Sequence, residues 1–159
     1  NTKDFIKMAK NINFLSPHNY KVVIAKIPNI EYFTTGVIIP ALNLNPAEYS
    51  TPTRQLKVFA DHLNFEDLTL NVIIDEDMEN YKEIFDWISE IVYTNDNTLD
   101  KTSDITVMVM NSKNNVIRNI RFTDAYPVSI GDIVFESNTE QLEYLTTAVN
   151  FVFTNMIFE

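Results

Sequence analysis

The chain of 159 residues contains no cysteine and only two glycines, Gly36 and Gly131. The absence of cysteine excludes disulfide bonds, cysteine-ligated zinc sites and thiol nucleophiles, and it fits folding in a reducing cytoplasm. Rossmann and P-loop phosphate-binding turns need several glycines at fixed spacing, because the backbone must approach a phosphate closely. Two glycines this far apart form neither turn.

Basic residues are few and scattered. Lysine and arginine number 12 against 22 aspartates and glutamates, which gives a net charge of −10. Tight binding to a phosphate backbone needs a basic patch, because counterion release drives that affinity. The sequence therefore excludes sequence-specific nucleic-acid recognition. Two interpretations of the acidity stay open: solubility, and a surface that lets nucleic acid pass without sticking.

Long hydrophobic runs are also missing. No run approaches the roughly 18 apolar residues of a membrane span, and residues 1–8 lack the apolar core of a signal peptide. We therefore expect no membrane anchor. The length suits one domain with a sizeable core, and a hydrophobic fraction of 45% is ordinary for a globular protein.

Residues that could carry chemistry form no recognisable constellation. His18 and His62 each lie in a polar turn with no nucleophile, base and orienting acid nearby in sequence. The acidic run at residues 75–79 invites a calcium interpretation, but an EF-hand loop needs glycine at its sixth position, where this chain has Asn80. We favour helix capping and solubility for this run, with a weak divalent site as the alternative.

Carboxylate pairs and aromatic residues also have ordinary explanations. Glu76 or Asp77 could pair with Asp86 or Glu90 as acid and base, but such pairs need a cleft that perturbs their pKa values, and no sequence feature indicates one. The aromatic residues occur at core spacing rather than among basic residues, so they favour core packing over stacking platforms for single strands. The sequence predicts a protein that is not an enzyme, with no catalytic residue, cofactor or metal.

The clearest structural pattern covers residues 68–92. Leu68, Leu70, Val72 and Ile74 alternate with Thr69, Asn71 and Ile73, which predicts a strand over residues 68–74. Asp75, Glu76 and Asp77 follow, and acids at this corner are expected to cap the next helix. That helix is the one long helix predicted, with Trp87 fixing it to the sheet. Its apolar stripe comprises Tyr81, Ile84, Trp87, Ile88 and Ile91.

Upstream of this stretch, the patterns predict strands joined by turns. Residues 1–13 carry apolar side chains at helical spacing and form either a short amphipathic helix or an arm that docks on a neighbour. Residues 20–27 and 31–39 are expected to form an antiparallel hairpin across Pro28 and Asn29, ending at Pro40. The remaining expectations are a long polar connection over 41–53, which is either a plain loop or a partner contact, a short edge strand over 54–59, and a turn over 61–64.

Downstream, the sequence predicts further strands. Residues 105–110 and 116–122 are expected to pair across a loop at 111–115, which is rich in residues that tolerate positive φ. A long strand at 142–158, apolar on both faces, closes the chain. Loops or turns are expected at 94–103, 124–131 and 137–140, with a short strand at 133–136.

These elements define a mainly β fold. We expect an antiparallel β-sandwich or barrel of about eight strands with one α-helix packed on the side. The domain organisation predicted is an arm or short helix over 1–13 followed by one β-domain over 14–159.

Five stretches together resemble the tail-tube protein family of contractile-tailed bacteriophages. They are residues 14–24, 37–41, 63–88, 122–131 and 144–153. In that family an early hairpin is followed by an aliphatic-proline strand end. A strand then runs through an Asp-Glu pair into a helix carrying a tryptophan. An aromatic-Pro-x-x-aliphatic-Gly turn and a C-terminal strand complete the domain.

The resemblance implies a structural virion protein made in the cytoplasm of a host bacterium. It implies hexameric rings that stack into a tube, with two hairpins per subunit closing a barrel around a lumen through which DNA passes without specific binding. Sheath and other tail or baseplate proteins are the implied partners, and residues 41–53 and 1–13 are the expected contacts between copies. A tube terminator or a baseplate tube initiator is the alternative within the family, and a monomeric β-sandwich binding module is the alternative of another class.

Overall fold

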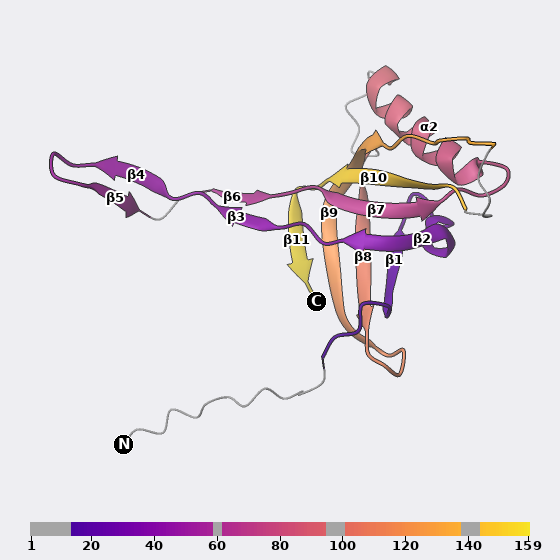
Figure 1. The fold of residues 1–159 in the computed structure, drawn as a ribbon, viewed down its shortest axis with the longest axis horizontal. Coiled ribbons are helices and arrows are strands. Elements are labelled where there is room, and N and C mark those ends of the chain that lie inside the picture. The colour runs from indigo at the N-terminus through magenta and orange to yellow at the C-terminus, as the bar shows by residue number, and fades with distance from the viewer. Residues whose placement is uncertain (1–13, 59–61, 95–100, 138–143) are drawn as a thin grey trace.

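Two antiparallel sheets that share one long strand form the body of the molecule (Figure 1). The computed structural model describes residues 14–58, 62–94, 101–137 and 144–159. The first sheet has the order β1-β8-β9-β11. Its strands are β1 (Tyr20–Ile24), β8 (Ser103–Met110), β9 (Val116–Ile130) and β11 (Asn155–Phe158).

The second sheet continues from the far end of β9. It has the order β9-β10-β7-β2, all antiparallel. The additional strands are β10 (Thr146–Val152), β7 (Leu68–Ile73) and β2 (Thr34–Ile38). The core lies between the two sheets and the long helix, where Val22, Ile24, Leu70, Phe122 and Phe151 are among the buried side chains. The predicted mainly β antiparallel fold is confirmed, although the described residues form eleven strands rather than eight.

Strand β9 bends where it passes from one sheet to the other. Asp124 adopts a positive φ of 51°, and beyond Ala125 the strand leaves β8 and pairs with β10. The prediction of a turn over 124–131 was therefore wrong. Pro127 is accommodated because it lies at a register shift opposite Phe151, and irregular positions of this kind tolerate the missing N–H of proline.

The predicted hairpin of residues 20–27 with 31–39 was also wrong. After the turn at Pro28, the chain forms one helical turn, α1 (Ile30–Phe33), whose end is tied by a hydrogen bond from the Thr34 hydroxyl to the Ile30 carbonyl. This turn carries the chain from the first sheet to the second. As a result β1 pairs with β8 and β2 pairs with β7, rather than with each other.

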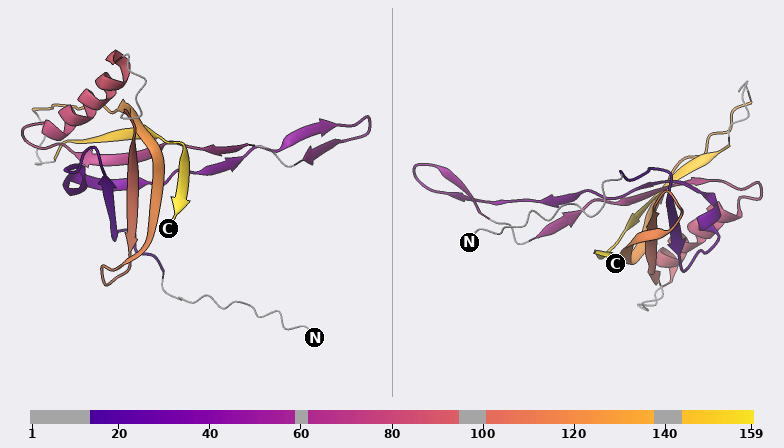
Figure 2. Two further views of the ribbon diagram at one scale, coloured as in Figure 1. Left: turned by 180° about the vertical axis from the view of Figure 1, so that it is seen from behind. Right: turned by 90° about the horizontal axis from the view of Figure 1, so that it is seen from below.

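A long two-stranded arm replaces the loop predicted over 41–53. Figure 2 shows it projecting from the body of the molecule. Strand β3 (Leu42–Leu44) pairs with β6 (Leu63–Phe65), and further out β4 (Ala47–Ser50) pairs with β5 (Gln55–Val58). The turn predicted at 61–64 was therefore wrong from Leu63 onward, whereas the edge strand predicted at 54–59 corresponds to β5.

The helix predicted within residues 68–92 is confirmed as α2 (Glu79–Tyr93). Ile84 and Trp87 are buried, and Ile88 and Ile91 pack against the core. Strand β7 alternates between buried and half-buried positions, as predicted, with Leu68, Leu70 and Val72 facing inward. An apolar stripe on the helix therefore meets the apolar face of the sheet.

The C-terminal part of the chain differs from its prediction. The single strand expected over 142–158 is two strands, β10 and β11, separated at Phe153 and Thr154, and each belongs to a different sheet. Residues 133–136 form no strand. The hairpin loop at 111–115 is confirmed, with Asn114 at a φ of 60°. Residues 1–13, and parts of the loops predicted at 94–103 and 137–140, lie outside the described residues.

Candidate functional site

The two histidines lie in separate, exposed parts of the chain. His18 precedes β1, where its backbone N–H donates to the Ser16 hydroxyl, and His62 precedes β6 at the arm. In the part of the chain that the structure describes, no group of three or more His, Cys, Asp or Glu side chains is placed to hold a metal ion. These residues give no geometric support to a catalytic or metal site.

The acidic corner before α2 is organised by Asn80 rather than by aspartate caps. Met78 occupies the N-cap position with a positive φ of 56° and no side-chain capping bond, so the capping role predicted for Asp75 and Asp77 was wrong. The Asn80 side chain accepts from the backbone N–H of Asp75 and of Tyr81, and it donates to the Ile73 carbonyl at 2.7 Å. One buried amide thus joins the end of β7 to the start of the helix.

The carboxylates considered as an acid–base pair are not brought together. Glu76 lies in a hollow with Ile74 and Phe135 at the start of α2, whereas Asp86 and Glu90 line a different hollow beside Lys26. Glu90 is engaged in an ion pair with Lys26 at 2.8 Å. The arrangement resembles an ordinary surface ion pair more than a reactive dyad.

The pKa values of Lys21 and Tyr20 are shifted, and neither shift favours catalysis. The Glu31 carboxylate, which accepts a hydrogen bond from Lys21, raises the pKa of that amine above its usual value. Burial raises the pKa of the Tyr20 hydroxyl. Both shifts move the group further from neutral pH, so neither prepares an acid or base for catalysis.

Open sheet edges are the more informative feature of the surface. Within the described residues, no strand pairs with the outer side of β1, β11 or β2. Exposed edges present unpaired backbone N–H and C=O groups and invite pairing with another chain. Because β1 and β11 lie on opposite sides of the first sheet, one copy offers two edges that a ring of copies could join.

The arm is the second surface feature that invites contact with another chain. Leu42, Leu44 and Leu63 are each more than half exposed, and the register places Leu42 opposite Phe65 and Leu44 opposite Leu63. Asn43 faces Asn64 and donates from its side chain to Glu66. The ribbon near the body thus has one apolar and one polar face, which is typical of a segment that packs on a partner.

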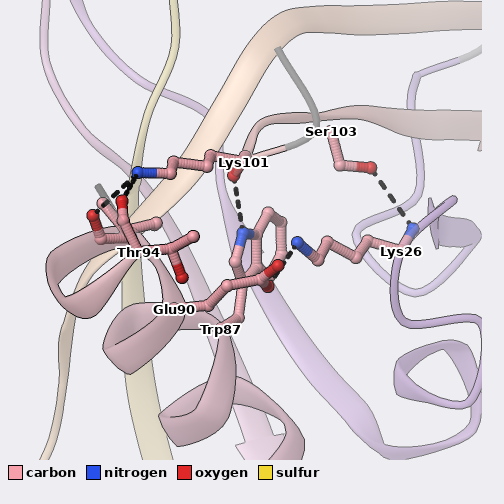
Figure 3. Close-up of polar contacts among 7 residues, drawn as sticks. Lys26, Trp87, Glu90, Thr94, Lys101 and Ser103 are labelled. Carbon is pink, nitrogen blue, oxygen red and sulfur yellow. Dashed lines mark hydrogen bonds and ion pairs between the residues drawn. The ribbon is translucent and has the colours of Figure 1, made fainter. Parts of the chain in front are cut away.

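The sequence interpretation missed the arm, Asn80 and the supporting role of Lys101. A signal for the arm existed, because Leu42 and Leu44 alternate with Asn43 as they would in a strand. Lys101 donates from its side chain to the carbonyls of Ile91 and Thr94 at the end of α2 (Figure 3). A bond from a side chain to backbone carbonyls seven and ten residues away leaves no periodic signal in the sequence.

No protein-family model and no curated protein matches the sequence. The fold does match solved structures of contractile injection systems. A chain of the anti-feeding prophage cap, the tube-terminating cap, superposes with a TM-score of 0.71 over 99% of both chains at 13% identity. A chain of the PVC sheath–tube complex has a TM-score of 0.68 over 93% of both chains at 16% identity. A chain of the PVC sheath/tube terminator has a TM-score of 0.68 at 17% identity, covering 94% of this chain and 99% of that one.

The chain therefore has the fold found among the tube, tube-terminator and cap components of contractile injection systems. This agrees with the fold that the tail-tube resemblance predicted. In the described residues, no helix is both long enough and apolar enough to cross a membrane.

Proposed function

We propose that the protein is a non-enzymatic structural subunit of a contractile tail, a tube subunit that forms stacked hexameric rings around a lumen. The observation that carries this proposal is the fold, which matches a chain of a sheath–tube complex over 93% of both chains. The open edges of β1 and β11 and the projecting arm supply the surfaces that such an assembly needs.

Ring closure accounts for the open edges. When β11 of one copy pairs with β1 of the next, the first sheets of all copies join into one closed barrel, and no edge of the first sheet remains exposed. In the described part of the chain, the outer edge of β2 in the second sheet stays open. Each copy contributes its four strands, and the connection is head to tail, so a rotation that closes gives a ring. The rings stack through the arm and through residues 1–13.

The outward face of the first sheet suits the lumen. Ile105 and Val107 point into the core, so Thr106 and Met108 point away from it. Both basic residues that strands β1 and β9 place on this face near the middle of the sheet form ion pairs: Arg121 with Glu159 at 2.9 Å, and Lys21 with Glu31 at 2.6 Å. A wall without a basic patch lets DNA pass without specific binding.

Phe158→Pro tests ring closure at the β11 edge. Asn119 and Glu159 exchange both backbone hydrogen bonds, at 3.0 and 2.8 Å, so the N–H of Phe158 points to the open edge. Proline removes that N–H and leaves the pairing with β9 intact. We expect light scattering and negative-stain microscopy to show rings or tubes for the natural chain and monomers for Phe158→Pro.

Phe158→Ala is the matched control, because it removes the same half-exposed side chain but keeps the N–H. It is expected to assemble. If the natural chain stays monomeric at high concentration and on a tube template, the proposal fails and a monomeric binding module becomes the better explanation. If Phe158→Pro assembles as well as Phe158→Ala, the β11 edge does not close the ring.

A tube terminator or an initiator at the baseplate is the second candidate. Its supporting observation is the match to a tube-terminating cap over 99% of both chains. Copy number separates the two roles: a tube subunit occurs in many rings per particle, and a capping protein in one. In either role the proposed partners are the sheath and neighbouring tail or baseplate proteins, and the proposed location is the phage tail of the virion.

A further inference from the structure

The exposed face of α2 has two parts. Phe85, Val92 and Tyr93 are 55%, 68% and 84% exposed, which is unusual for large apolar side chains on one helix. On the other side of the same face, Glu79, Asp86 and Glu90 are exposed. Between residues 75 and 93 the chain has seven acidic residues and one lysine.

A hollow on the acidic side is lined by three carboxylates and one lysine. The carboxylates are those of Glu83, Asp86 and Glu90, and they lie there together with Lys26 and Trp87. The carboxylate oxygen Oε2 of Glu83 is buried there without a hydrogen-bond partner among the described residues. Lys26 is already engaged with Glu90. A further ammonium group would supply the missing donor, since carboxylates in such positions need a paired charge.

One segment of the chain has the matching chemistry. Residues 1–13 contain three lysines and one aspartate, in a protein whose net charge is −10. Lys3, Lys7 and Lys10 recur at spacings of four and three residues. The apolar residues Phe5, Met8 and Ile12 recur at similar spacing. On a helix these two sets form a basic stripe and an apolar stripe.

We propose that residues 1–13 of one copy dock on the exposed face of α2 in the next copy, with lysines at the acidic hollow and apolar side chains on Phe85 and Val92. This contact deepens the proposed function, on which it rests, because it joins stacked copies head to tail. Such heterologous contacts generate extended stacks rather than closed pairs.

Geometry makes the recipient a different copy. Phe14 lines a hollow with Met110 and Lys113 at one end of β8, whereas Trp87 of α2 contacts Lys101 just before the other end. Figure 1 shows α2 near that other end. The eight residues of β8 separate these points by about 25 Å. On the helix that would align the two stripes, the rise is about 1.5 Å per residue, so Met8 lies only about 9 Å from Phe14 along the axis and Lys3 only about 17 Å. In that form neither the lysines nor the apolar residues of the segment reach the helix of their own chain.

Cysteine cross-linking tests the contact directly, because the natural chain has no cysteine. The Met8→Cys and Phe85→Cys variants are mixed under assembly conditions and oxidised. We expect a disulfide-linked dimer from this mixture, and a ladder of oligomers from the chain that carries both substitutions. The control pairs Met8→Cys with Tyr32→Cys, an exposed position on α1, and is expected to give little dimer.

Charge reversal then tests the chemistry. Glu79→Lys with Asp86→Lys is expected to lower the yield of cross-linked dimer about tenfold, the effect of losing two modest ion pairs. Adding Lys3→Glu and Lys7→Glu on the other partner is expected to restore it. The matched charge control is Asp132→Lys with Glu136→Lys, which lies off the helix and is expected to leave the yield unchanged.

Three outcomes overturn the inference. A cross-link within one chain contradicts docking between copies. A yield equal to that of the Tyr32 control, in a sample that light scattering shows to be assembled, refutes this contact but leaves the ring subunit standing. A natural chain that stays monomeric throughout, even on a tube template, removes the proposed function and this contact together.

Discussion

Trp87 connects three parts of the molecule through one side chain. It is 2% exposed, and its ring lies 6.0 Å from that of Phe151 on β10. Its indole N–H donates to the Lys101 carbonyl at 2.8 Å, and the Lys26 ammonium lies 5.4 Å from the ring centroid (Figure 3). The core position predicted for this residue is confirmed. Its contacts link the helix, the second sheet and the segment that enters β8.

Trp87→Ala is expected to reduce the free energy of unfolding by about 3–5 kcal/mol, the usual cost of truncating a large buried aromatic residue. Chemical denaturation followed by far-UV circular dichroism measures the change. Phe85→Ala on the same helix is the control and should cost less than about 1 kcal/mol, because its side chain is more than half exposed. An equal loss in both variants would mean that α2 does not pack through Trp87.

Asn80 holds the corner between β7 and α2 through its side-chain hydrogen bonds. It is 2% exposed, and its amide satisfies one carbonyl and two N–H groups at the corner between β7 and α2. Satisfied buried amides fix a unique geometry, because any other arrangement leaves polar groups unpaired. Glu76, Asp77 and Glu79 stay on the surface, where they contribute charge rather than capping, whereas Asp75 is half-buried.

At the scale of elements, the arm projects from the body and makes few of the described contacts with it. An isolated two-stranded ribbon is marginally stable in water. The described contacts between the arm and the core are few, and the ring of Phe65, 5.4 Å from Phe153, is one at its base. The apolar face of β3 and β6 is therefore available for a neighbouring subunit.

The double substitution Leu44→Asn and Leu63→Asn tests the arm. Both side chains are more than half exposed, so we expect the melting temperature of the subunit to stay nearly unchanged while assembly, measured by light scattering, is lost. The matched pair Val128→Asn and Val134→Asn removes two exposed apolar side chains outside the arm and should assemble. Normal tubes from the Leu44/Leu63 variant would exclude this face from the interface.

At the scale of the whole molecule, the two sheets are not independent. Strand β9 is part of both, and β10 and β11, which follow each other, belong to different sheets. Unfolding one sheet therefore removes the partner strands of the other. Such shared strands favour a single cooperative unit.

Cooperative unfolding is checked with the monomeric Phe158→Pro variant, so that association does not contribute. The single tryptophan reports on the contact of α2 with the second sheet, and far-UV circular dichroism reports on all strands. We expect the two urea transitions to coincide. A fluorescence transition at clearly lower urea than the circular dichroism transition would show that α2 separates before the sheets unfold.

Local patterns anticipated much of this structure. The alternation of Leu68, Leu70 and Val72 and the helical stripe through Trp87 were correctly interpreted, because burial on one face imposes a period. The arm was mistaken for a loop since its polar composition and its prolines hide the alternation of Leu42 and Leu44. The second half of strand β9 was mistaken for a turn, because a proline such as Pro127 usually ends a strand.

By itself, the sequence determined the composition, the charge, the absence of cysteine chemistry and the elements whose side chains face a core with regular spacing. Tertiary structure alone decided which strands pair. One helical turn at residues 30–33 moves β2 to the other sheet, and a bulge at Asp124 carries β9 across both. The physical reason is that hydrogen bonding between strands is non-local, and many partners satisfy the same backbone groups until the whole core selects one arrangement.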